Sequence, residues 1–436
     1  MHAELLIHAE WILTVDPENR QLTDHAVAIA DGRIQAILPY EEARRTIQAE
    51  QTVELPDHVL IPGLINAHTH AAMSLLRGLA DDLPLMTWLH EHIWPTEQRW
   101  VDASFVADGT RLAVLEMLRG GVTCYNDMYF HPEVTAQVTA EAGMRAVIGM
   151  IVVDFPTGYA ASPDEYIAKG LALHERYRDH PLIRVAWAPH APYSVSDAPL
   201  QRVANLAQEL DVPIHIHLHE TQDEVANALN AHGERPFARL DRLGLIGPAL
   251  AAVHMTQLEH IEIARLAETG ASVVHCPKSN LKLASGFCPV ARLLEAGVNV
   301  ALGTDGAASN NDLNLLGEMR TAALLGKGVA HSASAVPATE ALRMATINGA
   351  RALGLDSEIG SIELGKSADL VALDLRDPYT QPLYHPVSQL VYAAGRHQVR
   401  QVWIRGRQVI HDGASTTLHV AEVISEAQIW GARISE

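Results

Sequence analysis

Several features are scarce in this chain of 436 residues, and each scarcity excludes a class of protein. Only 3 cysteines are present and none form a CxxC pair, which excludes a disulfide framework and leads us to expect a cytoplasmic protein. Lys and Arg number 32 against 52 Asp and Glu, a formal charge of −20, so we expect no nucleic-acid partner and no anionic membrane partner. No apolar run approaches the roughly 18 residues that a membrane helix needs.

What the chain does have is a repeated alternation of apolar, β-branched runs with amphipathic helical segments, from about residue 59 to residue 354. Eight apolar runs occur over a length typical of a TIM barrel, so the pattern predicts an α/β fold of the (β/α)8 type. Further helices are expected at 313–325 and 338–353. The eight expected strands are Val59–Asn66, Val122–Asp127, Arg145–Val153, Ile183–Pro189, Pro213–Leu218, Leu250–His254, Ser272–Cys276 and Val298–Thr304.

The two ends of the chain share a different pattern of short strands joined by tight turns. Asp31-Gly32 separates two apolar runs near the N-terminus, which is a strong hairpin signal, and strand-like runs return at Asp369–Leu373 and Val399–Ile404. We therefore expect a small β-sandwich domain built from both termini. The expected division gives residues 1–58 and 365–436 to this domain and 59–364 to the barrel, with a helical tail at about 337–354.

Side chains that can bind a metal or move a proton stand at the ends of several expected strands, where a TIM barrel carries its chemistry. His68 and His70 are two residues apart on a strand and therefore share one face. With a His and an Asp from two other strands, they would offer three imidazoles and one carboxylate, a donor set suited to Zn²⁺ or Fe²⁺. The strand-end residues are His68, His70, His190, His215, His217, His219, Glu220, His254 and Asp305.

Several motifs resemble those of a known family. The segment Ile61–His70, the HxxE motif from His217 to Glu220 and the Thr304-Asp305-Gly306 turn resemble the amidohydrolase superfamily. More narrowly, the sequences DGAASNN from Asp305 and PKSNLKL from Pro277 resemble the 5′-methylthioadenosine/S-adenosylhomocysteine deaminases and their triazine-hydrolase and guanine-deaminase relatives. The resemblance covers nearly the whole chain, including the divided β domain.

The resemblance implies roles for the strand-end residues. Glu220 would be the acid–base group, which must be protonated to donate to N1 of a purine when water attacks C6. His254 would hold the attacking water, and Asp305 would share its proton. Many relatives bridge two metals with a carboxylated lysine after the fourth strand, whereas Arg184–Ser194 contains no Lys, so we expect one divalent ion per chain, Zn²⁺ first, with Fe or Mn as alternatives. The implied ligands are His68, His70, His217 and Asp305.

The resemblance also implies substrate contacts. Glu97 corresponds to a carboxylate that accepts hydrogen bonds from both ribose hydroxyls. Trp88 would pack against the ribose and the 5′ substituent. His190 would contact the purine or the ribose, and Glu220 would contact the purine ring. Relatives that accept S-adenosylhomocysteine carry arginines after the third strand, whereas residues 150–166 contain no Arg or Lys and Met150 stands at the corresponding position. We therefore expect an uncharged 5′ group.

The predicted reaction is deamination of 5′-methylthioadenosine at C6 to 5′-methylthioinosine and ammonia, with S-adenosylhomocysteine or adenosine as weaker substrates. The alternative is a guanine or other purine deaminase, or an s-triazine hydrolase, of the same superfamily. Glu97 favours a nucleoside, because the purine bases and s-triazines of the alternative have no ribose hydroxyls for it to bind. A remote alternative is a non-catalytic scaffold of this fold, and a homo-oligomer stays open.

Four other histidines receive structural expectations. His215 and His219 share a strand face with His217, and we expect both to serve packing or the pocket rim. His275 is expected behind the site or in a structural role. His131, like most of the remaining histidines, is expected at the surface.

Overall fold

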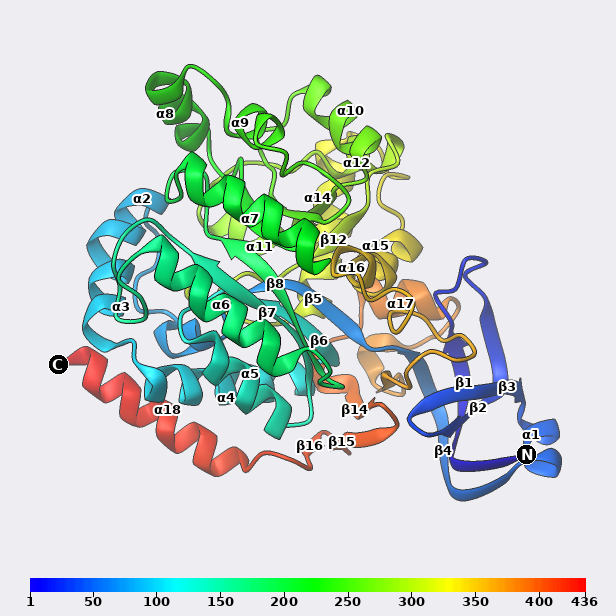
Figure 1. The fold of residues 1–436 in the computed structure, drawn as a ribbon. Coiled ribbons are helices and arrows are strands. Elements are labelled where there is room, and N and C mark those ends of the chain that lie inside the picture. The colour runs from blue at the N-terminus through cyan, green and yellow to red at the C-terminus, as the bar shows by residue number, and fades with distance from the viewer.

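The computed structural model describes residues 1–436 and confirms the predicted barrel. Eight parallel strands lie in the order β12-β11-β10-β9-β8-β7-β6-β5 (Figure 1). Asp305 N donates to the carbonyl of His68 at 3.0 Å, which joins the last strand to the first. The barrel strands are β5 (Leu64–Thr69), β6 (Val122–Asp127), β7 (Arg145–Val152), β8 (Ile183–Pro189), β9 (Ile214–Leu218), β10 (Leu250–His254), β11 (Ser272–His275) and β12 (Val300–Leu302).

Helices cover the outside of the barrel, so its strands are buried on both faces and read as nearly continuous apolar runs. The predicted helix at 338–353 is divided by Ala345 and Thr346 into two short helices. The helices after the strands are α4 (Ala103–Arg119), α5 (Pro132–Glu141), α6 (Pro163–Tyr177), α7 (Asp197–Leu210), α8 (Gln222–His232), α9 (Pro236–Arg242), α10 (His260–Thr269), α11 (Pro277–Lys282), α12 (Val290–Glu295), α13 (Ala307–Asn310), α14 (Leu315–Val329), α15 (Ala338–Met344) and α16 (Ile347–Ala352).

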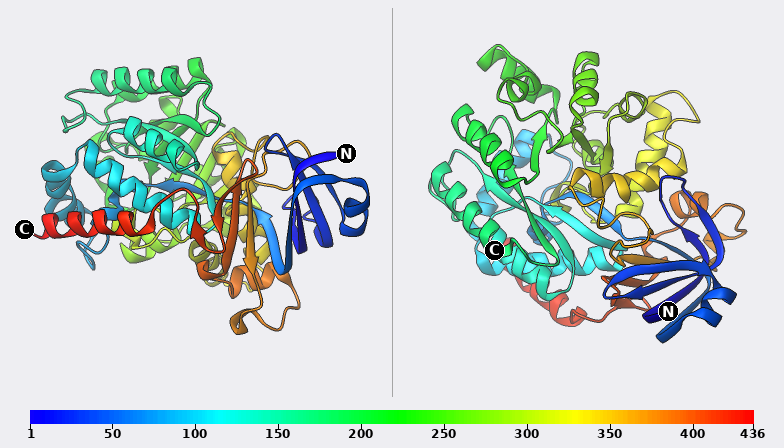
Figure 2. Two further views of the ribbon diagram at one scale, coloured as in Figure 1. Left: turned by 90° about the horizontal axis from the view of Figure 1, so that it is seen from below. Right: turned by 45° about the vertical axis from the view of Figure 1, so that its right-hand side comes forward.

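A second, mixed sheet of eight strands is built from both termini, as expected. The sheet curves, so that the Asp31-Gly32 turn lies next to the Arg405-Gly406 turn. Ala368 links the two turns: its N–H donates to Gly32 O at 2.9 Å, and its carbonyl accepts from Gly406 N at 3.0 Å. Figure 2 shows its N-terminal strands, in blue, on the side of its C-terminal strands, in orange and red, that faces away from the barrel. Its strands are β1 (His2–Leu13), β2 (Gln21–Ala30), β3 (Arg33–Pro39), β4 (Gln48–Pro62), β13 (Leu370–Asp374), β14 (Val399–Ile404), β15 (Arg407–His411) and β16 (Ala414–Ser415). Helix α1 (Tyr40–Thr46) packs on this sheet, whereas α17 (Pro386–Tyr392), which follows β13 in the chain, packs against the barrel helices α14 and α15.

The first predicted barrel strand, Val59–Asn66, is wrong in its bounds. Residues 59–62 end β4 and pair with β1 and β13 of the terminal sheet, and the barrel strand starts only at Leu64. The chain passes between the two sheets at Gly63, where an added Cβ would lie 1.9 Å from Thr123 Oγ1, so only glycine fits. An uninterrupted apolar run hides this change of sheet, and we propose Gly63 as the domain boundary.

The C-terminal helix α18 (Val420–Ser435) leaves the β domain to which the sequence assigned it. It runs along barrel helix α4 (Figure 1), and Trp430 Nε1 donates to Asp108 at 3.0 Å. Before α4, the segment after β5 forms short helices that lie over one end of the barrel: η1 (Ala71–Leu76), α2 (Leu85–Thr87), η2 (Trp88–Ile93) and α3 (Trp94–Trp100). Among all the helices, none combines the length and the apolar character needed to cross a membrane.

Candidate active site

Four side chains from three barrel strands place their donor atoms within 4.8 Å of one another at the C-terminal end of the barrel. His68 lies in β5 and His70 directly follows that strand, His217 lies in β9, and Asp305 follows β12. Nε2 of His68 and Nε2 of His70 lie 3.2 and 3.3 Å from Oδ1 of Asp305. Three imidazoles and one carboxylate suit a divalent transition metal, and these are the four residues that the sequence predicted as ligands.

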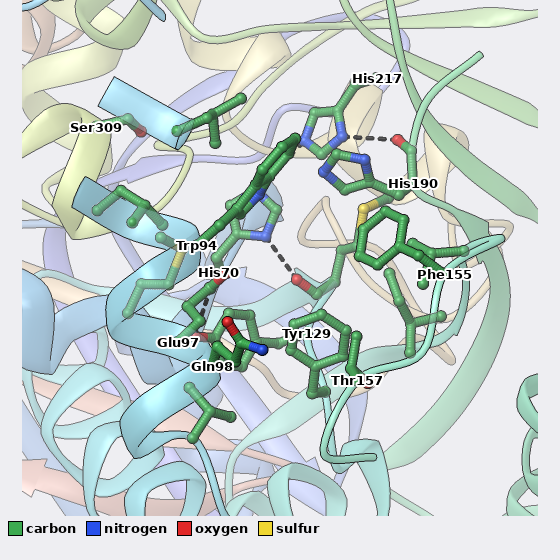
Figure 3. Close-up of a pocket in the computed structure, with 18 of the residues that line it drawn as sticks. His70, Trp94, Glu97, Gln98, Tyr129, Phe155, Thr157, His190, His217 and Ser309 are labelled. Atoms are coloured by element: carbon green, nitrogen blue, oxygen red, sulfur yellow. Dashed lines mark hydrogen bonds between the residues drawn. The ribbon is translucent and has the colours of Figure 1, made fainter. Parts of the chain in front are cut away.

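Backbone carbonyls orient two of these imidazoles. His70 Nδ1 donates to Met128 O at 2.5 Å, and His217 Nδ1 donates to His190 O at 2.7 Å (Figure 3). Because a carbonyl only accepts, each Nδ1 carries the proton and each Nε2 presents its lone pair to the site. The two rings are therefore held in the tautomer that binds a metal.

Asp305 is held by two serines from the motifs that carried the narrower resemblance. Ser279 Oγ and Ser309 Oγ donate to its Oδ2 at 2.6 and 2.8 Å, and Gly306 N donates to its Oδ1 at 2.8 Å. Burial works against the charged form, but hydrogen bonds and charge from His68 and His70 in their protonated forms, a role that a bound metal ion would take over, hold the pKa of Asp305 well below its usual value. A φ of 61° at Asp305 adds backbone strain, as is common at functional sites.

Glu220 and His254 stand together beside the donor set. Glu220 Oε1 lies 3.8 Å from His254 Nε2, and His254 Nδ1 bonds Asn280 Oδ1 at 2.8 Å, which points Nε2 into the cavity. Burial raises the pKa of Glu220, so its protonated form is favoured and can donate a hydrogen bond. His254 has a φ of 74°, a second strained position at the ends of the strands.

A cavity of about 590 Å³ opens at this end of the barrel, which lies within the usual range for small-molecule sites. Of its 29 lining residues 16 are hydrophobic, and none is Lys or Arg. The cavity contains three of the metal donors, His70, His217 and Asp305, with Glu220 and His254. Every predicted site residue except His68, which lies behind them, lines it.

Glu97, on α3, faces the same cavity from the helical cover. Tyr129, which follows β6, donates its hydroxyl to Glu97 Oε1 at 2.7 Å (Figure 3). Burial raises the pKa of Glu97 to about 7, although the Tyr129 hydrogen bond acts in the opposite direction. This carboxylate therefore changes charge near neutral pH.

Trp88 and His190 also line the cavity. Trp88 belongs to η2 and is 6% exposed. His190 follows β8, and its Nδ1 lies 2.9 Å from Ser194 Oγ. Burial lowers the pKa of His190 to about 3, so the ring is neutral and can donate or accept a hydrogen bond.

Several aromatic side chains of the cavity escaped the sequence prediction. Tyr129, His131, Phe155 and Tyr159 follow strands β6 and β7, so the strand-end rule could have pointed to them. His131, expected at the surface, lines the cavity.

Met150, to which the resemblance pointed, does not line the cavity. It is fully buried against Gly170 of α6. Because alternate residues of a strand face opposite sides, Ile151 and Val153 line the cavity instead.

The three histidines without an assigned role lie in different surroundings. His219 Nε2 accepts the backbone N–H of Phe237 at 3.1 Å, which is a structural contact. His275 is 1% exposed and lies on β11. His215 was expected in packing or at the pocket rim, but it is fully buried and its Nε2 lies 2.8 Å from Nδ1 of His68.

A parallel eight-stranded barrel with a largely buried His₃Asp donor set, a neighbouring Glu and a His at its C-terminal end defines a barrel-type metallohydrolase. A family model described as the amidohydrolase family matches residues 59–409. The chain belongs to the amidohydrolase family.

Named relatives share almost the entire length of the chain. A Teredinibacter turnerae protein named 5-methylthioadenosine/S-adenosylhomocysteine deaminase is 51% identical over 428 residues, which cover 98% of this chain and 97% of the relative. The zinc-bound crystal structure of an adenosine deaminase from Xanthomonas campestris is 54% identical, with a TM-score of 0.99 over 100% of this chain and 99% of the other. The zinc complex of atrazine chlorohydrolase from Arthrobacter aurescens, at 22% identity, shows the shared fold with a TM-score of 0.91 over 98% and 99% of the two chains.

Proposed function

We propose that this protein removes the 6-amino group of an adenine nucleoside by metal-dependent hydrolysis, with 5′-methylthioadenosine as the preferred substrate and zinc as the single metal ion. The products are 5′-methylthioinosine and ammonia. The observation that carries the proposal is that one cavity is lined both by three of the four metal donors with Glu220 and by the separate carboxylate Glu97. The first set suits attack on an amidine carbon, and the second suits a ribose.

His68, His70, His217 and Asp305 would hold the ion. A divalent ion at such a site lowers the pKa of water from 15.7 to about 7, which supplies a nucleophile at neutral pH. His254 then orients the attacking water through Nε2, because Asn280 holds its Nδ1. Asp305 shares the water's proton.

Glu220 supplies the complementary acid. Attack at C6 places negative charge on N1 of the purine, and a protonated carboxyl group donates to that atom. Burial raises the pKa of Glu220 and so favours this form. Ammonia then needs a proton at the 6-amino group, which Glu220 and Asp305 can deliver between them.

Glu97 favours a nucleoside over a free base or a triazine. An ionised carboxylate accepts from two vicinal hydroxyls, and Tyr129 holds one of its oxygens without occupying all of its acceptor sites. His190 and Trp88 would contact the purine and the ribose. The alternative purine and triazine substrates offer no diol to this group.

The 5′ substituent should be uncharged. With purine and ribose placed as above, the remaining wall includes Val101, Phe155 and Tyr159, and no Lys or Arg lines any part of the cavity. Burying a carboxylate without a partner there is unfavourable by about 1–3 kcal/mol or more. A methylthio group meets no such penalty, so S-adenosylhomocysteine is the weaker substrate.

The names of the relatives agree with this class of reaction, since they include a 5-methylthioadenosine/S-adenosylhomocysteine deaminase and a zinc-bound adenosine deaminase. A small-molecule nucleoside partner follows from the proposal, and we also propose that the enzyme works in the cytoplasm.

The test is ammonia release from 5′-methylthioadenosine, S-adenosylhomocysteine, adenosine, adenine and guanine, with metal content determined on the same sample. We expect the highest kcat/KM for 5′-methylthioadenosine and one zinc ion per chain. Turnover of the bases but not the nucleosides would refute the role of Glu97. Efficient turnover of S-adenosylhomocysteine would refute the uncharged tail, and a second tightly bound ion would refute the mononuclear site.

A further inference from the structure

His68 differs from the other two imidazoles of the donor set in what holds its second nitrogen. His70 and His217 each donate Nδ1–H to a backbone carbonyl. His68 Nδ1 instead lies 2.8 Å from Nε2 of His215, with the two rings at 75°. A carbonyl dictates which partner carries the proton, whereas a second imidazole can either donate or accept.

We infer that His215 is a positioning residue for the metal site, held in the Nδ1–H tautomer so that its Nε2 accepts a hydrogen bond from His68. The inference rests on the proposed metal site, because His68 can offer Nε2 to an ion only when its own proton is on Nδ1. If His215 donated instead, the proton of neutral His68 would sit on Nε2 and block the ligand atom. Only one combination of tautomers is therefore compatible with a metal.

The surroundings of His215 support a role beyond packing. Both rings are fully buried inside the barrel, and no protein group forms a hydrogen bond with Nδ1 of His215. An unpaired buried N–H is unfavourable by about 1–3 kcal/mol, which an apolar side chain would avoid. The surrounding barrel interior is lined by small apolar residues, including Ala251, which pairs with His215 across β9 and β10. A polar ring at this position is explained by its contact with a metal ligand.

The test measures zinc affinity without turnover. Apo-protein is titrated with zinc against a chromophoric chelator for wild type, His215→Leu, His215→Asn and His275→Leu. The His275 variant is the matched control, because that imidazole is also buried on a barrel strand with an unpaired Nδ1 but bonds no metal donor. Partners of ligating histidines typically change metal affinity by about 10–100-fold when removed, so we expect this loss in His215→Leu. We expect wild-type affinity in His275→Leu and partial recovery in His215→Asn, whose amide oxygen can accept from His68.

Equal zinc affinity in wild type and His215→Leu would overturn the inference. Absence of zinc binding in the wild type would overturn the metal site itself, so the two failures are distinguishable. Thermal unfolding of each apo-protein separates loss of fold from loss of affinity. If His215→Leu does not fold, neutron diffraction of the zinc-loaded wild-type enzyme decides: deuterium on Nδ1 of both His68 and His215 is expected, and deuterium on Nε2 of His215 contradicts the inference.

Discussion

The hydroxyl of Tyr129 donates to Glu97 Oε1 at 2.7 Å, although the first residue follows a barrel strand and the second lies on a helix that covers the cavity. This bond orients the carboxylate proposed to bind the ribose. We expect Tyr129→Phe to raise KM for 5′-methylthioadenosine by about 5- to 10-fold, the size of one hydrogen bond of ordinary strength, because the carboxylate stays but loses its fixed orientation, and to change kcat little. Steady-state kinetics provide the measurement. Tyr125→Phe is the control, because the Tyr125 hydroxyl bonds Thr139 outside the cavity, and an equal rise in KM there would argue against a specific role.

The pKa of Glu97, raised to about 7 by burial, predicts a pH dependence of substrate binding. Below pH 7 the carboxyl gains a proton and can no longer accept from both hydroxyls, so only the ionised form binds the ribose well. One pH unit below the pKa, about a tenth of the groups remain ionised, so KM should be roughly ten times higher at pH 6 than its plateau above pH 8. In Glu97→Gln this dependence should vanish and KM should be high at every pH. A KM profile that Glu97→Gln leaves intact would assign the titration to another group.

Glu220→Gln removes the proposed proton donor to N1. Loss of a general acid typically lowers rates by about 10²–10⁴-fold, so we expect kcat to fall in this range with KM within a few-fold of wild type. Zinc content should stay at one ion per chain, because Glu220 is not among the four clustered donors. The same change at Glu262, a buried carboxylate bonded to Arg235 at 2.8 Å away from the cavity, should leave kcat within a few-fold of wild type. Loss of zinc from Glu220→Gln would make it a ligand instead.

Asn280 orients His254 by accepting its Nδ1–H at 2.8 Å. Asn280→Ala should lower kcat by about 10–100-fold with little change in KM, because the water-orienting imidazole would lose its fixed direction. Asn280→Asp keeps an acceptor at the same place and should recover much of the rate. If the Ala and Asp variants lose activity equally, the role of Asn280 is in packing and not in orienting His254.

Phe155 lines the cavity and is 41% exposed, so a longer polar side chain can be accommodated there. We expect Phe155→Arg to supply the missing cation for an amino-acid tail. The ratio of kcat/KM for S-adenosylhomocysteine to that for 5′-methylthioadenosine should rise by about 10-fold or more, the size of one charge-assisted hydrogen bond. Phe155→Leu is the neutral control and should leave the ratio near its wild-type value. An equal effect of both substitutions would show that size, not charge, controls selection.

Much of the molecule follows from local sequence pattern. The alternation of apolar runs and helical segments predicts the barrel, because buried parallel strands and amphipathic helices leave different periodicities. His68, His70, His217 and Asp305 could be found because the ends of barrel strands meet at one face whatever the details of packing. The change of sheet at Gly63 was missed, since the apolar run continues through it.

The contacts that refine the site were decided by tertiary structure. His215 and His68 are 147 residues apart and meet only because the packing inside the closed barrel brings their rings together, and the alternation of β7 turns Met150 away from the cavity toward α6. Tyr129 and Glu97 likewise meet where a strand-end loop and a covering helix pack. By itself, the sequence determined the barrel, the terminal β domain and the candidate ligands, because these depend on local periodicity. Which side chain orients each candidate ligand depends on strand register and side-chain packing, and both exist only in the folded chain.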